Sequence, residues 1–105
     1  MKIELLAGAV PLGVCEAQVI DAAMGVIGGQ LLPAPAYFGH YQSLFRAHLQ
    51  QPNWPGMQTL GLKAVMPLGN ELEAAGGICI TDVEGFHEIQ VEFCGVDHTV
   101  LTEWE

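Results

Sequence analysis

The chain has 105 residues, of which half are hydrophobic and 14% are charged, and its formal net charge is −9. This length and composition favour one folded domain, 1–105, and exclude a disordered chain. The net charge belongs to the C-terminal part, because residues 64–105 contain no lysine or arginine. Such a one-sided negative field disfavours nucleic acid and anionic membranes as partners, and it permits a cation or a basic protein.

The first two predicted elements are a strand and a helix. Residues 1–7 alternate between apolar and polar side chains, which is typical of a strand. Residues 14–27 carry apolar side chains at helical spacing, and Gly28 with Gly29 supplies a stop signal. We therefore predict a helix over 14–27, followed by a proline-rich connector at 32–36.

The clearest periodicity of the chain predicts a second helix, over residues 37–50. Its aromatic and aliphatic side chains recur at the i, i+3, i+4, i+7 spacing of one helix face. Pro52 ends this helix, because the residue before a proline avoids the helical region. Residues 51–56 are then predicted to form a loop.

The C-terminal half reads mainly as strands. We predict a strand over 59–66, whereas residues 71–75 fit either a strand or a short helix. The remaining sequence has the pattern of a β-meander, in which the second hairpin pairs Phe93 with Val100. The predicted fold is α+β, with two N-terminal helices packed on one face of a mainly antiparallel sheet of four to five strands that ends in this meander.

The first hairpin of the meander suggests one candidate catalytic pair. With its tip at residues 84–85, Ile80 lies opposite Ile89, and Asp82 lies opposite His87 at the rim of the core. A carboxylate beside an imidazole can hold the tautomer that base catalysis needs. The alternative, which we favour, is a structural pair that satisfies two polar groups beside the core.

A candidate ligand-binding site lies on the second helix. Its aromatic stripe is first of all a core face, but Tyr37, Tyr41 and His48, with Trp54 in the following loop, are expected to line a pocket against the sheet. Aromatic rings with polar tips suit a small, largely apolar ligand.

The sequence carries no signature of a metal site or of a cofactor, and we expect neither. Cys79 and Cys94 are interpreted as small buried hydrophobes. Glu4 interrupts any apolar signal region, and the odd number of widely spaced cysteines fits a reducing cytoplasm. The high apolar content favours a homodimer that covers exposed hydrophobic surface.

Three functions from different classes remain open. The preferred hypothesis is a homodimeric binding module for a small apolar ligand held between helix 37–50 and the sheet. The second is an acidic inhibitor or antitoxin-like protein that binds a basic partner. The third is a small hydrolase or isomerase that uses the pair of His87 and Asp82.

Overall fold

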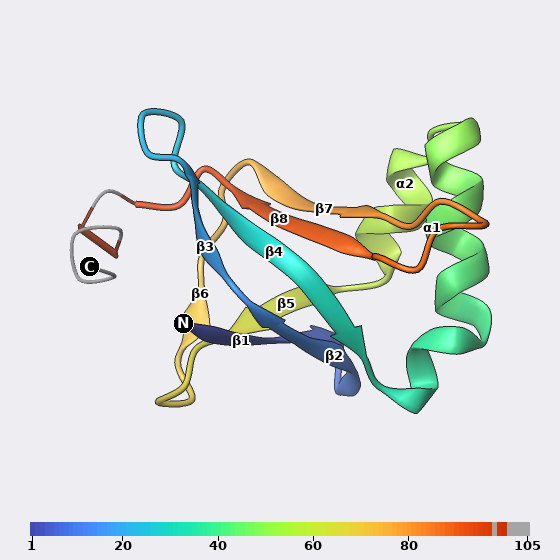
Figure 1. The fold of residues 1–105 in the computed structure, drawn as a ribbon, viewed down its shortest axis with the longest axis horizontal. Helices are drawn as coiled ribbons and strands as arrows, with labels where there is room; N and C mark the ends of the chain where they lie inside the picture. The colour runs from blue at the N-terminus through green and yellow to red at the C-terminus, as the bar shows by residue number, and fades with distance from the viewer. Residues whose placement is uncertain (98, 101–105) are drawn as a thin grey trace.

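The computed structural model describes residues 1–97 and 99–100 of the chain (Figure 1). Strands dominate the described part, and the helices lie in the middle of the sequence. In chain order the elements are β1 (Lys2–Ala7), β2 (Val10–Glu16), β3 (Gln18–Asp21), β4 (Val26–Pro33), the 3-10 helix η1 (Pro35–Phe38), α1 (His40–Gln50), α2 (Trp54–Thr59), β5 (Leu62–Val65), β6 (Glu71–Leu72), β7 (Gly77–Thr81) and β8 (Gln90–Cys94).

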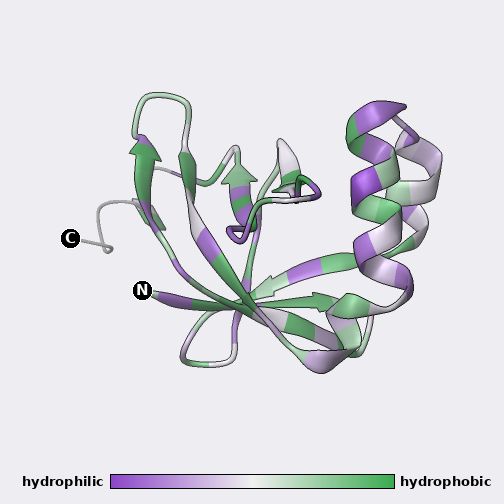
Figure 2. Ribbon diagram, turned by 45° about the vertical axis from the view of Figure 1, so that its right-hand side comes forward, coloured by the Kyte–Doolittle hydropathy of each residue, from purple (hydrophilic) through white to green (hydrophobic). Residues whose placement is uncertain are grey.

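Over the described residues, eight strands form one antiparallel sheet that curls into a half-barrel. The strand order is β6-β5-β1-β2-β4-β8-β7, and β3 pairs with β4 beside this path. The helices do not lie N-terminal to the sheet or over one broad face of it, so the predicted arrangement is wrong. Instead, α1 and α2 stand together at one end of the half-barrel (Figures 1 and 2).

The predicted helix over residues 14–27 is wrong, because this segment forms β2, β3 and the start of β4. The apolar residues that imitated a helix are divided by a turn, in which Asp21 Oδ1 accepts a hydrogen bond from Met24 N at 3.2 Å. Gly25 closes the turn with a positive φ of 68°, a conformation that glycine adopts readily. Gly28 and Gly29, interpreted as a helix stop, belong to β4.

The second predicted helix is present as η1 and α1, which together cover most of residues 37–50. The predicted loop after it contains the start of α2. Asn53 caps this helix, since its side-chain oxygen accepts a hydrogen bond from Gly56 N at 3.1 Å. Residues 71–75, left open by the sequence, contain the two-residue strand β6.

The first C-terminal hairpin is present, but its register differs by two residues from the prediction. Ile80 pairs with Val91 instead of Ile89. A shift of two keeps every side chain on its predicted face. Phe93 pairs with Ile27 on one side and Ile78 on the other, so the predicted pairing with Val100 is wrong. The remainder of that third strand, 101–105, lies outside the described residues.

The core fills the inside of the curled sheet. Its fully buried side chains come from both halves of the chain and include Ile3, Leu5, Leu12, Ile27, Leu31, Tyr37, Val91 and Phe93. Along several strands in Figure 2, hydrophobic segments in green alternate with hydrophilic ones in purple, as expected when successive side chains point to opposite faces of a sheet. Within the described residues, no helix has the length and apolar character needed to cross a membrane.

Candidate binding site

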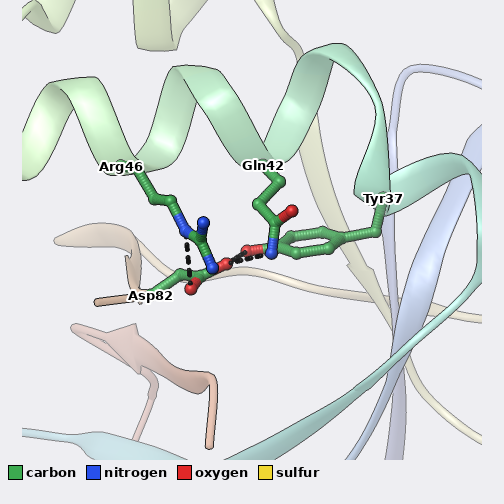
Figure 3. Close-up of polar contacts among 4 residues, drawn as sticks. All are labelled: Tyr37, Gln42, Arg46 and Asp82. Atoms are coloured by element: carbon green, nitrogen blue, oxygen red, sulfur yellow. Dashed lines mark hydrogen bonds and ion pairs between the residues drawn. The ribbon is translucent and has the colours of Figure 1, made fainter. Parts of the chain in front are cut away.

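A buried carboxylate joins the helical end of the molecule to the sheet. Asp82 follows β7 directly and is only 1% exposed. Its Oδ2 accepts hydrogen bonds from Tyr37 Oη at 2.7 Å and from Gln42 Nε2 at 3.1 Å. Its Oδ1 accepts one from Arg46 Nε at 3.1 Å, which also makes an ion pair. Figure 3 shows the three donors converging on the carboxylate from η1 and α1.

The charge state of this cluster follows from these contacts. Burial acts to raise the pKa of Asp82, but the hydrogen bonds from Tyr37, Gln42 and Arg46 and the charge of Arg46 outweigh it, so the pKa lies below its ordinary value. Burial raises the pKa of the Tyr37 hydroxyl, and its bond to Asp82 raises it further. The phenol therefore remains a donor to an ionised carboxylate at neutral pH.

Asp82 is thus an anchor that fixes η1 and α1 against the end of β7. Both of its oxygen atoms are engaged by the helical segment, and none of these contacts involves His87. His87 is exposed in the segment 82–89 between β7 and β8. The cross-strand pairing that suggested a dyad is wrong, because the chain leaves the ladder after Thr81, where the side chain of Asp82 turns to α1.

Beside this anchor, α1 and α2 leave a cleft along β7, here called the β7 cleft. Its volume is about 170 Å³. Residues from three elements line it, and most of them are apolar. The lining residues are Phe45, His48, Leu49, Trp54, Met57, Ile78, Cys79, Ile80 and Thr81.

His48 and Trp54 form the helical wall of the β7 cleft. Their rings meet edge to face, with centroids 4.6 Å apart and planes at 83°. The Nδ1 atom of His48 accepts a hydrogen bond from Asn53 N at 2.7 Å. This contact at the end of α1 assigns the proton of a neutral ring to Nε2 and fixes how the chain enters α2. The indole of Trp54 is nevertheless 63% exposed.

The four residues expected to bind a ligand divide into two pairs. His48 and Trp54 both line the β7 cleft. Tyr37 lies in the core, fully buried, with its ring stacked on Phe45 at 6.0 Å and its hydroxyl on Asp82. Tyr41 is half-buried against the core, and its ring meets His40 edge to face at 5.9 Å. Neither tyrosine lines the β7 cleft.

A larger hollow continues from the β7 cleft, and we call it the seam groove. It has a volume of about 560 Å³ and lies between β7 and the pair β5–β6, at the open side of the half-barrel. Trp54, Met57 and Ile78 line both hollows. Lys63, Glu71 and Glu73 supply the charged side chains of the seam groove.

Sequence reasoning missed Arg46 and Met57. Arg46 is the one Asp, Glu, Lys or Arg residue between Asp21 and Lys63. A single cation in such a long neutral stretch is a signal that an acid needs a partner. Met57 gave no signal, because the helix α2 that carries it follows a proline and reads as a loop.

The cysteines also differ from their interpretation as buried hydrophobes. Cys79 is exposed and Cys94 is half-buried, whereas Cys15 is buried. Cys79 and Cys94 are neighbours on the outer face of β7 and β8, and burial, followed by the interaction with Cys79, raises the pKa of Cys94. Among the described residues, no three His, Cys, Asp or Glu side chains converge into a group able to hold a metal ion.

Comparisons with protein-family models, with curated protein sequences and with solved structures found no match for the chain. The fold and the site therefore define its class on their own. It is a mainly β protein of the α+β type, with a helical end that shapes an apolar cleft beside an edge strand.

Proposed function

We propose that this protein is a binding module whose ligand places an apolar group in the β7 cleft. The observation that carries the proposal is the cleft itself, where Trp54, Met57 and Ile78 present apolar surface beside the edge of β7. A large exposed indole in a concave apolar site is typical of ligand recognition. We also propose that the protein is cytoplasmic and forms a homodimer.

The size of the β7 cleft limits what it can take. Its volume of about 170 Å³ is smaller than the roughly 300–1,000 Å³ of sites that enclose a drug-sized molecule. A cavity of about 150 Å³ is large enough for benzene. The cleft therefore suits one aromatic ring or one branched aliphatic chain, and the rest of the ligand lies outside it.

A catalytic function has less support from the geometry. Both oxygen atoms of Asp82 accept hydrogen bonds from η1 and α1, and His87 lies exposed in a different part of the segment 82–89. A general base must reach the proton that it removes, and an orienting carboxylate must reach the base. The pair of His87 and Asp82 does not meet this requirement, which leaves the hydrolase or isomerase hypothesis without a geometric basis.

The proposal is tested with Nile red, a neutral apolar dye that fluoresces when it leaves water. We expect saturable binding that Trp54→Ala weakens by about tenfold, because the variant removes one wall of the cleft. Phe86→Ala is the matched control, since this aromatic side chain is 71% exposed and lies outside the cleft. Equal binding by both variants, or no saturable binding by the unmodified protein, would contradict the proposal.

A further inference from the structure

The edge of β7 offers unpaired backbone groups to a ligand. Among residues 1–97 and 99–100, β7 is the last strand of the sheet and pairs with β8 alone, from Gly77 to Thr81. On its free side an edge strand presents the N–H and C=O groups of alternate residues. The Gly77 N–H already donates to Ala74 O at 2.9 Å, so the N–H groups open to a ligand belong to later residues of the strand. The two hollows described above lie along this free side.

Unlike β6 at the other end of the sheet, β7 carries no feature that prevents pairing. β6 has only two residues, one of which is Glu71, and short or charged edges resist the addition of a strand. β7 has five residues, Gly-Ile-Cys-Ile-Thr, without charge or proline, and its ladder with β8 is regular. An edge of this kind is open to an added strand.

The two hollows form one continuous path along β7. The β7 cleft lies at Ile80 and Thr81, the seam groove reaches Gly77, and Ile78 lines both. Five residues of strand measure about 17 Å. An extended ligand can therefore follow the whole strand, with one apolar side chain in the β7 cleft and the rest of its length in the seam groove.

The charges around this path favour a cationic ligand. Glu71 and Glu73 line the seam groove, and Glu92 lies across from Cys79 on the outer face. Among the residues that line the seam groove, Lys63 is the one basic side chain. Since residues 64–105 contain no lysine or arginine, the local field is negative. At this edge it attracts basic partners and disfavours a second copy of a chain with a net charge of −9.

We propose that β7 binds an extended, basic polypeptide segment as an added strand. One apolar side chain of the segment fills the β7 cleft, and its basic side chains lie beside Glu73 and Glu92. This inference rests on the proposed function, because it identifies the chemical class of the ligand whose apolar group the cleft receives. Backbone pairing supplies affinity, and the cleft supplies selectivity for the apolar position.

The test uses the peptide Lys-Val-Lys-Phe-Lys-Val-Lys, with blocked ends, and its counterpart with glutamate in place of lysine. We expect the basic peptide to bind at least about tenfold more tightly at low salt, and this advantage to shrink as salt rises. An added strand uses the N–H groups of alternate residues. N-methylation of the peptide residues whose N–H groups face β7 should therefore abolish binding. N-methylation of the alternate residues, whose N–H groups face away, should change the affinity by less than about twofold.

Equal effects of the two methylated sets would overturn strand addition, as would the absence of binding at millimolar peptide. Tighter binding of the acidic peptide would overturn the choice of a basic partner. Glu73→Gln should weaken the basic peptide about threefold, and Glu16→Gln, on strand β2, which lines neither hollow, should not. If the protein binds neither peptide but its binding of Nile red still depends on Trp54, this inference is refuted and the proposed function stands.

Discussion

At the scale of single residues, Asp82 decides how the helical end is held. Replacing it by asparagine keeps the shape but removes the charge that Arg46 and Tyr37 are arranged around. We expect Asp82→Asn to lower the free energy of unfolding by about 1–3 kcal/mol, the range for hydrogen bonds to a buried charged group. Urea denaturation measures this loss. Glu84→Gln, an exposed acid in the same segment, is the control, and an equal effect there would remove the special role of Asp82.

The same carboxylate predicts a pH dependence. Its pKa in the folded protein lies below its value in the unfolded chain, which is about 3.9. Between those two values the unfolded state binds more protons, so stability rises with pH and the full contribution is present above the unfolded pKa. Denaturation between pH 2 and 7 should show stability falling as the pH drops below about 4, with a shallower fall in Asp82→Asn. Identical profiles would contradict this assignment.

The burial of Asp82 was predictable, but its partners were not. The period-two pattern assigns Asp82 to the same face as Ile80, and both are buried there. Tyr37, Gln42 and Arg46 are 36 to 45 residues away in sequence. Such contacts depend on how the helical segment folds back over the sheet, and local spacing carries no information about that.

At the scale of elements, β4 shows why a helix was predicted where strands form. Glycine pairs occur both at helix ends and where two backbones approach closely, so Gly28-Gly29 is ambiguous. In the structure, a methyl group added to Gly28 would lie 2.2 Å from Val91 O and 3.0 Å from Glu92 Cα, both backbone atoms of β8. The glycine is therefore required by the close pairing of β4 with β8.

This contact predicts that Gly28→Ala destabilises the protein although alanine favours ordered backbone. The clash with β8 cannot be relieved by a side-chain rotation, so the expected loss is about 1–3 kcal/mol, as for overpacked cores. Thermal and urea denaturation measure it. Gln30→Ala, at an exposed position of the same strand, serves as the comparison and should change stability by less than about 0.5 kcal/mol. A neutral Gly28→Ala would show that β4 and β8 are not this close.

At the scale of the whole molecule, the apolar composition predicts self-association. Several large apolar side chains outside the β7 cleft are exposed in the described part, among them Leu68, Phe86, Met24 and Leu32. A second subunit that covers such surface would stabilise both copies. Sedimentation equilibrium should report twice the mass of the chain at micromolar concentration, and a single-chain mass over the whole concentration range would contradict the homodimer. The negative net charge opposes association, so the dimer should strengthen as salt rises.

The overall architecture was only partly accessible from the sequence. The mixed α+β composition, the helix that begins near residue 40 and the hairpin of β7 with β8 follow from local periodicity. The position of β8 between β4 and β7 does not, because strand order depends on which distant edges meet. Of the residues expected to bind a ligand, His48 and Trp54 line the β7 cleft, and their role there stays a prediction, while Met57 and the edge of β7 could be placed only from the fold.

The central claim, that the free edge of β7 is the binding surface, is tested most directly by amide hydrogen exchange followed by NMR. With the basic peptide bound, exchange should slow at alternate residues of β7 after Gly77, whose N–H already donates to Ala74 O, and remain unchanged along β3, another exposed strand. Unchanged exchange along β7 at saturating peptide would contradict the claim. Protection of β7 that follows protein concentration instead of peptide would contradict it as well, since the occupant would then be a second copy of the chain.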